Sequence, residues 1–183
     1  MNKIKVIALF GASASGKDTI QKWVVANYKN INSIVSCTTR PKRDYEKNQI
    51  DYYFLSIEEF TKCLLEEQIL EVTDFKGWFY GTPIWALKPK KVNIGVFNIA
   101  GIEALLQDSR LDVYPIYICA NDKTRLLRSL NRKENPDCNE ICRRFQIDKK
   151  DFSFIDFSYY TIDNDGPGLN EEALRTIFDN LIN

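Results

Sequence analysis

The sequence predicts a three-layer α/β fold, in which a parallel sheet is covered by helices on both faces. Four continuous apolar runs, VIALF, INSIVSCT, VNIGVFNIAG and LDVYPIYICA, alternate with segments of helical character near residues 17–28, 101–109, 122–133, 137–155 and 170–182. Buried parallel strands are continuous apolar runs, and their alternation with helices is typical of this class. The chain has 183 residues, of which 44% are hydrophobic, and this favours one compact domain.

The first apolar run leads directly into the stretch GASASGKDT. Its G-x-x-x-x-G-K spacing is that of a phosphate-binding loop. Gly11 and Gly16 let the backbone curl so that N–H groups converge on a phosphate, and Lys17 adds a positive charge. The helix expected from DTIQKWVVANYK aims its N-terminus at the same anion. The predicted phosphate site consists of Gly11, Ala12, Ser13, Ala14, Ser15, Gly16, Lys17, Asp18 and Thr19.

Asp18 stands where the strict motif has Ser or Thr for a magnesium ion, and Thr19 follows it. One interpretation gives the metal-side position to the Thr19 hydroxyl. Another has the Asp18 carboxylate hold Mg²⁺ directly or through water, which suits a cation that prefers oxygen ligands. A third has Asp18 only complement the helix dipole. We expect Thr19 on the metal side and keep Asp18 as a second candidate.

Residues 35–88 interrupt the alternation of strands and helices. They carry short strand patterns in DYYFLS, QILEVTDF and GWFYGTP, and a helix pattern in SIEEFTKCLLEEQ, capped by Ser56 with Glu59 completing a capping box. We expect an insertion with a small sheet of its own. Ligands of such folds bind beyond the carboxyl ends of the parallel strands, so the insertion would stand beside the phosphate loop.

Arginine and hydroxyl side chains gather near the start of this insertion, in SCTTRPKRDYEKNQIDYYF. The planar guanidinium groups of Arg40 and Arg43 suit phosphate oxygens. RPKRD by itself favours a solvated charged turn over a binding site. Its place after a strand and beside a phosphate loop favours a second phosphate site.

Composition excludes several classes of function. The formal net charge is +0, from 25 basic and 25 acidic residues, which argues against a nucleic-acid coat protein. No apolar run approaches the roughly 18 residues that span a bilayer, and no signal peptide is evident. The five cysteines lack C-x-x-C spacing and there is no histidine. We therefore expect free thiols in the cytoplasm, no zinc site, no histidine-based nucleophile, and no nucleic-acid or membrane partner.

Several motifs in order resemble the guanylate kinase family. SCTTRPKRDYEKNQIDYYFLS followed by LEVTDFKGWFYGTP is similar to the family's region for binding a nucleoside monophosphate (NMP). That region reads Ser-x-Thr-Thr-Arg-x-x-Arg, then Asp-Tyr-x-Phe, Glu and Tyr-Gly-Ser/Thr. The match runs from the phosphate loop to Thr82 and extends more weakly to the C-terminal helix. The resemblance implies a single P-loop NTPase domain over residues 1–183, with a core (1–34, 89–125 and 156–183), an NMP-binding subdomain (35–88) and a helical lid (126–155).

The resemblance also implies roles for residues of the insertion. The acceptor phosphate would be held by Ser36, Arg40, Arg43, Tyr52 and Tyr80. Glu71 would accept from guanine N1–H and the 2-amino group, and Thr82 would donate to O6, which matches their chemistry. Asn98 stands where the family has an acid that also reads guanine, and Val96 replaces a second acid. An amide both accepts and donates, so Asn98 weakens the expectation of strict guanine specificity.

Arginines recur at helical spacing in NDKTRLLRSLNRKENPDCNEICRRFQIDKK, where RKENPD reads as a loop. Composition alone would make this a basic solvated face. The resemblance makes it the lid, whose arginines close over the transferring phosphate. Arg132 and Arg144 match the lid positions best, with Arg128 and Arg143 as alternates. Asn164, in TIDNDG, matches the segment that contacts adenine.

We therefore expect ATP-dependent, Mg²⁺-assisted phosphorylation of a nucleoside monophosphate, GMP or dGMP, by a monomer or homodimer. Lys17, Arg132 and Arg144 would be the catalytic residues. The acceptor phosphate is already ionised, so no general base is needed. Three alternatives stay open: a kinase with another or broader base preference, a non-catalytic guanylate-kinase-like binding domain, and a plain nucleotide switch or ATPase.

Overall fold

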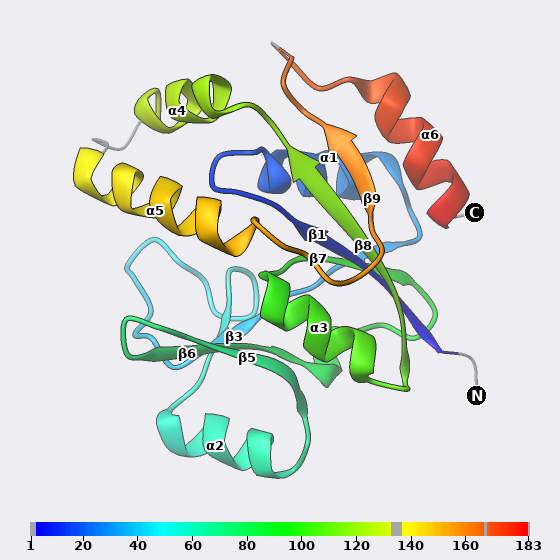
Figure 1. Cartoon of the computed structure of the whole chain (residues 1–183). Helices are drawn as coiled ribbons and strands as arrows, with labels where there is room; N and C mark the ends of the chain where they lie inside the picture. Colours follow the sequence, from blue (N-terminus) through cyan, green and yellow to red (C-terminus); the bar gives the residue numbers. More distant parts are fainter. Residues whose placement is uncertain (1–2, 133–136, 167, 183) are drawn as a thin grey trace.

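The computed structural model describes residues 3–132, 137–166 and 168–182, which fold around two sheets (Figure 1). The described part of the core sheet has five strands in the order β2-β7-β1-β8-β9, and every neighbouring pair is parallel. The strands are β1 Ile4–Phe10, β2 Ile31–Ser33, β7 Val92–Val96, β8 Leu111–Cys119 and β9 Tyr160–Asp163. The predicted parallel α/β fold is confirmed.

Helices cover both faces of the core sheet. α1 (Lys17–Asn27) and α6 (Glu171–Ile182) pack on one face, where Ile20, Val24 and Phe178 are fully buried against the strands. α3 (Ile99–Gln107) packs on the other face and also contacts the small sheet. α4 (Asp122–Leu130) and α5 (Cys138–Asp151) follow β8 and lie beyond its carboxyl end (Figure 1).

The small sheet is mixed, with the order β4-β3-β6-β5. β3 pairs in parallel with β4 and antiparallel with β6, which pairs antiparallel with β5. Its strands are β3 Cys37–Thr38, β4 Tyr53–Phe54, β5 Ile69–Phe75 and β6 Trp78–Pro83. The helix α2 (Ile57–Leu65) connects β4 to β5, and a 3₁₀ turn, Ile84–Ala86, follows β6. The predicted capping box is present, because Glu59 N donates to Ser56 Oγ and Ser56 N donates to Glu59 Oε2.

Several predicted boundaries differ in the structure. The run INSIVSCT is two strands in different sheets, since β2 ends at Ser33 and β3 begins at Cys37. β9 was not among the predicted strands, because its pattern is weak and Ile162 is its one buried residue. α5 ends at Asp151 rather than 155, and α4 ends at Leu130 rather than 133. The predicted lid loop lies partly outside the described residues, over positions 133–136.

Across the described ranges, no helix combines the length and apolar character needed to cross a membrane.

Candidate active site

The phosphate loop joins β1 to α1 through two glycines with left-handed backbone. Gly11 has a φ of 145°, and Gly16, the N-cap of α1, has a φ of 103°. A Cβ atom on Gly11 would lie 2.2 Å from the Ile118 carbonyl oxygen, and one on Gly16 would lie 2.1 Å from Asn164 Nδ2. The close approach of these neighbours and the positive φ both require glycine.

Lys17 opens α1, and its side chain turns back over the loop. Its Nζ donates to the carbonyl oxygen of Gly11 at 2.7 Å and to that of Ala12 at 3.0 Å. Burial lowers the pKa of the ammonium group, against the opposing effect of nearby Asp18 and Asp148. A positive charge held in such a partly dehydrated place attracts an anion more strongly than a solvated charge does.

A cavity of about 490 Å³ opens over the loop, and we call it the loop cavity. It is lined by Ser13, Ala14, Gly16, Lys17, Asp18, Thr19, Arg128, Arg132 and Arg144. The fold thus brings three of the predicted arginines to the predicted loop. The other loop residues predicted for the site, Gly11, Ala12 and Ser15, are buried.

Glu140 organises the arginines of α5. Its carboxylate accepts from Arg143 Nε and Nη2 and from Arg144 Nε, each at 2.8 Å. These bonds hold the pKa of the Glu140 carboxyl at about 2. Arg144 lines the loop cavity, whereas the Arg143 guanidinium lies 6.0 Å from the ring centroid of Phe75 in β5. The alternate lid residue Arg143 therefore faces the small sheet.

Asn164 and Arg128 support the loop from behind. Asn164 Nδ2 donates to the Ser15 carbonyl oxygen at 2.7 Å, and the side chain is only 6% exposed. Arg128 donates to the same oxygen at 3.3 Å and to the Asn164 carbonyl oxygen at 2.7 Å. The amide of Asn164, expected at an adenine, is thus engaged by the loop backbone. Arg128 therefore stabilises the phosphate loop and also lines the loop cavity.

A second cavity, of about 400 Å³, lies between the small sheet and the end of β7, and we call it the sheet cavity. Its lining combines hydroxyl, amide, carboxylate and aromatic side chains: Ser36, Tyr52, Glu71, Thr73, Phe75, Tyr80, Gly81, Val96, Phe97 and Asn98. Five residues that the resemblance assigned to the acceptor nucleotide are therefore brought together.

Glu71 is the carboxylate of the sheet cavity. The hydroxyl of Thr82, which is only 1% exposed, donates to Glu71 Oε1 at 2.8 Å. Burial raises the pKa of the Glu71 carboxyl, and hydrogen bonds from Thr82 and Thr73 partly oppose this. Thr82, which the resemblance assigned to the base, donates here to the acid that faces the cavity.

Asn98 has a structural task besides lining the sheet cavity. Its Oδ1 accepts from Gly101 N at 2.7 Å and caps α3, and its Nδ2 donates to Thr73 Oγ1 at 2.9 Å. Both ends of this amide are therefore hydrogen-bonded within the protein.

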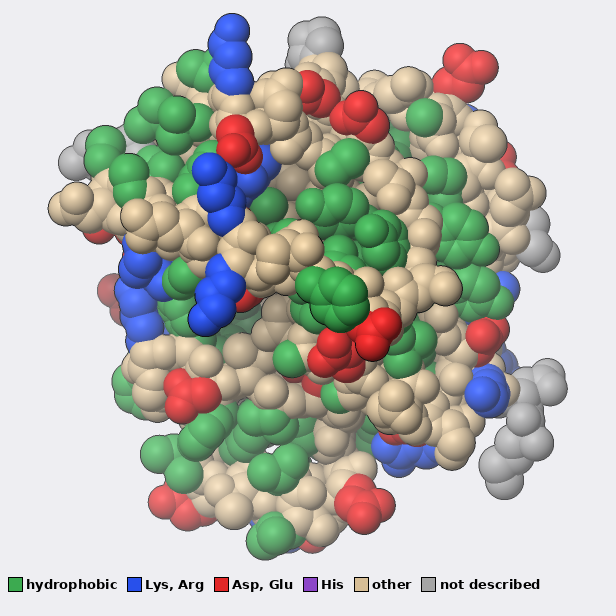
Figure 2. All heavy atoms as spheres, viewed as in Figure 1, with side chains coloured by type: hydrophobic (Ala, Val, Ile, Leu, Met, Phe, Trp, Pro, Cys, Tyr) green, Lys and Arg blue, Asp and Glu red, His purple; other side chains and the backbone are tan. Residues whose placement is uncertain are grey.

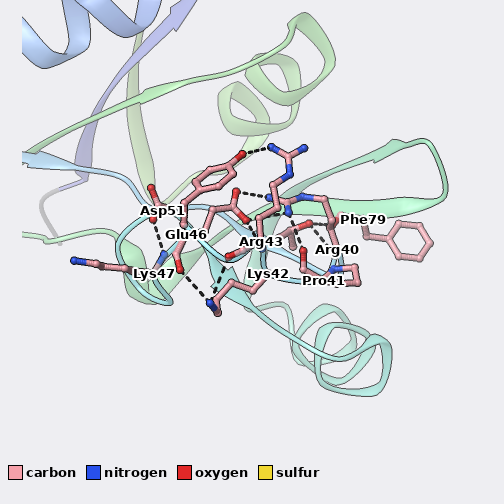
Figure 3. Close-up of polar contacts among 10 residues, drawn as sticks. Arg40, Pro41, Lys42, Arg43, Glu46, Lys47, Asp51 and Phe79 are labelled. Carbon is pink, nitrogen blue, oxygen red and sulfur yellow. Dashed lines mark hydrogen bonds and ion pairs between the residues drawn. The ribbon is translucent and has the colours of Figure 1, made fainter. Parts of the chain in front are cut away.

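Arg40 is held in place by an acid that sequence reasoning missed. Its guanidinium makes a two-pronged pair with Glu46, at 2.7 Å and 3.0 Å, and Arg43 N donates to the same carboxylate at 2.8 Å (Figure 3). The guanidinium lies 5.6 Å from the ring centroid of Tyr52, which lines the sheet cavity. The Arg43 side chain is exposed and donates to the Tyr45 hydroxyl. The signal available in the sequence was an acid three residues after Arg43, in a turn where basic residues outnumber acidic ones.

The comparisons with known proteins agree with this geometry. The model of the family described as guanylate kinase matches residues 3–180. The chain belongs to the guanylate kinase family. It is 30% identical to the guanylate kinase of Malacoplasma penetrans over 96% of this chain and 92% of that protein. It is 28% identical to that of Desulfitobacterium hafniense over 94% of this chain and 88% of that protein.

The fold of the family is recognisable in a solved structure as well. The crystal structure of guanylate kinase from Anaplasma phagocytophilum aligns with a TM-score of 0.65 at 23% identity, covering 99% of this chain and 86% of that one. The resemblance inferred from the motifs is thus confirmed, and with it the prediction of an ATP-dependent nucleoside monophosphate kinase.

A guanylate kinase needs donor and acceptor sites that adjoin, and the lining residues connect the two cavities. Asp18 lines the loop cavity and also a neighbouring cavity that shares Ser36, Tyr52 and Val96 with the sheet cavity. Basic side chains gather between α5 and the small sheet (Figure 2). Both cavities lie at the carboxyl ends of core strands, the loop cavity after β1 and the sheet cavity at the end of β7.

Proposed function

We propose that this chain transfers the terminal phosphoryl group of ATP to GMP, with ATP in the loop cavity and GMP in the sheet cavity. Membership of the guanylate kinase family supports the reaction. The observation that carries the assignment of sites is the neighbouring cavity that links them, because Asp18 of its lining also lines the loop cavity and Val96 of its lining also lines the sheet cavity.

On the donor side, the loop backbone and Lys17 would hold the β- and γ-phosphates. Three arginines line the same cavity: Arg128 on α4, Arg132 just after α4, and Arg144 on α5. Their positive charges are suited to neutralise the charge of the transferring phosphoryl group. We propose that Asn164 contacts the adenine of ATP. Its hydrogen bond to the Ser15 carbonyl oxygen also stabilises the phosphate loop.

On the acceptor side, Arg40 lies beside Tyr52 of the sheet cavity, and the GMP phosphate would be held by Arg40 and Arg43 together with Ser36, Tyr52 and Tyr80 of the cavity lining. Glu71 would accept from guanine N1–H and the 2-amino group, and Thr82 keeps the Glu71 carboxylate oriented. Val96 and Phe97 contribute apolar surface to the lining of the same cavity.

The family implies Mg²⁺ with ATP, and the residues of the loop cavity fit such an ion. Thr19 and Asp18 contribute oxygen atoms, the ligand type Mg²⁺ prefers, and both are exposed. Among the described residues, no group of three or more Cys, Asp or Glu could hold a metal. This agrees with an ion bound by one or two side chains together with substrate phosphates. Bound Mg²⁺ would supply charge neutralisation on the ATP phosphates.

The chain's own residues would then act by positioning and electrostatics. Arg40 would align the acceptor phosphate with the γ-phosphorus, and Lys17 and the α4–α5 arginines would stabilise the charge of the transition state. The acceptor phosphate is its own nucleophile, so no histidine is needed. Closure of the proposed lid (126–155) and the proposed NMP-binding subdomain (35–88) over the core would exclude water and protect ATP from hydrolysis.

The base preference is the finer part of the proposal. Asn98 Oδ1 and Nδ2 each make one hydrogen bond within the protein, with Gly101 N and Thr73 Oγ1, and Glu71 is the carboxylate that lines the sheet cavity, so we assign the reading of the guanine edge to Glu71. We therefore propose that a guanine nucleotide is the acceptor, and the assay below offers GMP and dGMP separately.

The test is initial-rate ADP production from ATP·Mg²⁺ with GMP, dGMP, AMP, CMP, UMP and dTMP as separate acceptors. Turnover dominated by GMP and dGMP is expected. Turnover dominated by another base would overturn the acceptor assignment. ATP binding by folded protein with no acceptor-dependent turnover would overturn the kinase activity itself.

A further inference from the structure

A buried ion pair joins α4 to α5 directly beneath the phosphate loop. Arg125 Nη2 donates to Asp148 Oδ2 in a hydrogen bond between charged groups. Arg125 is 5% exposed and Asp148 is 9% exposed. The guanidinium also pairs with Asp122 at 2.9 Å and lies 4.3 Å from the ring centroid of Phe145. Arg125 is therefore fixed on several sides.

Both members of the pair also bond to the main chain of one loop residue. Ser13 N donates to Asp148 Oδ2 at 2.9 Å, and Arg125 Nε donates to the Ser13 carbonyl oxygen at 2.9 Å. The Ser13 hydroxyl lies 3.4 Å from Asp148 Oδ1. Ser13 thus has its backbone donor and its backbone acceptor satisfied by side chains that are 135 and 112 residues away in sequence.

The position of Ser13 makes this contact relevant to ATP. Ser13 lies between Ala12, whose carbonyl oxygen accepts from Lys17, and Ala14, which has a φ of 61°. Ser13 and Ala14 both line the loop cavity. Fixing the peptide groups on either side of Ser13 therefore fixes the direction of neighbouring N–H groups and the anchor of the Lys17 ammonium group.

Stability alone is a weak reason for such a pair. A buried ion pair loses most of its Coulomb gain to desolvation, and a pair of apolar residues often serves a core as well. An unpaired Asp148 carboxylate next to a phosphate site would also repel ATP, and Arg125 offsets that charge.

We propose that Arg125 and Asp148 are positioning residues, which hold the phosphate loop in its binding shape and tie α4 and α5 to it. The inference rests on the proposed ATP site in the loop cavity. It gives the helices of the proposed lid a fixed attachment at Ser13, from which Arg128, Arg132 and Arg144 reach the same cavity.

The test replaces the pair by apolar residues of similar size in the double variant Arg125→Met/Asp148→Leu. The matched control is Arg110→Met/Asp108→Leu, which removes an ion pair before β8, at the opposite end of the core strands from the loop. The measurements are the melting temperature, the KM for ATP, the KM for GMP and kcat.

We expect the double variant to stay folded while its KM for ATP rises roughly tenfold, the equivalent of one charged hydrogen bond. Its KM for GMP and all constants of the control should stay near those of the parent. A double variant that melts like the parent and keeps the parent's KM for ATP would overturn the proposal. So would a loss of melting temperature with no change in any kinetic constant.

The single variant Arg125→Met adds a second discrimination. It leaves the Asp148 carboxylate without Arg125, so its KM for ATP should exceed that of the double variant. Equal values in the single and double variants would contradict the charge-offset part of the proposal.

Hydrogen exchange keeps the proposal testable if the variants do not fold. In the nucleotide-free parent protein, the Ser13 amide should exchange slowly because Asp148 accepts its hydrogen bond. Exchange as fast as that of an unprotected loop amide would overturn the proposal. Lys17→Met separates this inference from the ATP site on which it rests, since unchanged ATP turnover in that variant would refute the site itself.

Discussion

The substitution Glu71→Gln tests the reading of guanine by the sheet cavity. The Thr82 hydroxyl donates to Glu71 Oε1 at 2.8 Å, so the remaining acceptor capacity of the carboxylate faces the cavity. Glutamine keeps the size and one oxygen but presents an NH₂ group to a guanine edge that also donates. One charge-assisted hydrogen bond is lost, which is worth about 1.5–3 kcal/mol and lowers kcat/KM for GMP roughly 10- to 150-fold.

The assay is initial-rate ADP production at saturating ATP, with GMP and inosine monophosphate each varied. Inosine monophosphate lacks the 2-amino group, so the parent should prefer GMP, and Glu71→Gln should reduce this preference. Glu66→Gln, at an exposed acid after α2, is the matched control. The reasoning is refuted if Glu71→Gln leaves the ratio of the two kcat/KM values unchanged, or if the KM for ATP changes instead.

The same acid predicts a pH dependence. Burial raises the pKa of Glu71 above its ordinary value of about 4.3. The ionised form that accepts from guanine is therefore lost as the pH falls through this raised pKa, earlier than for an exposed glutamate. The KM for GMP should rise on mild acidification in the parent, and this rise should be absent in Glu71→Gln.

Three further predictions concern the loop and the Arg40 turn. Burial lowers the pKa of Lys17, so kcat/KM for ATP should fall at a pH below the ordinary lysine value of about 10.4, and an unshifted alkaline limb would contradict this. Gly16→Ala puts a Cβ against Asn164 Nδ2 at positive φ, so its melting temperature and ATP binding should both decrease, whereas a parent-like melting curve would refute the strain. Glu46→Gln releases Arg40, so the KM for GMP should rise with the KM for ATP unchanged, and equal changes in both would indicate general destabilisation.

The secondary structure and the phosphate loop were predictable because their signals are local. Continuous apolar runs identify buried strands, and the spacing of Gly11, Gly16 and Lys17 identifies the loop by its own backbone demands. The boundary at Ser33 was not predictable, because INSIVSCT contains no Gly or Pro to mark a break and only the packing decides that β2 and β3 join different sheets. β9 was not predicted for a related reason, because a short edge strand with one buried residue has almost no hydrophobic pattern in the sequence.

Individual residues of the candidate site were predictable from the sequence, whereas the hydrogen bonds and ion pairs between them were not. The resemblance named Glu71, Tyr52 and Arg40, but it assigned Thr82 to the base, whereas the Thr82 hydroxyl donates to Glu71. The ion pair of Arg125 and Asp148 had no local signal at all. Their positions are 23 residues apart, and nothing in either helix indicates that both side chains meet under Ser13.

The sequence by itself therefore determined the α/β class, the glycine-rich loop between β1 and α1, the inserted small sheet and, for a chain without any histidine, the membership of a kinase family. Each of these depends on neighbouring residues, whose spacing dictates backbone conformation and burial. Only the tertiary structure decided which acid restrains Arg40, which hydroxyl orients Glu71, and how α4 and α5 are tied to the loop. Those contacts join distant segments, and their geometry exists only once the sheets and helices have packed.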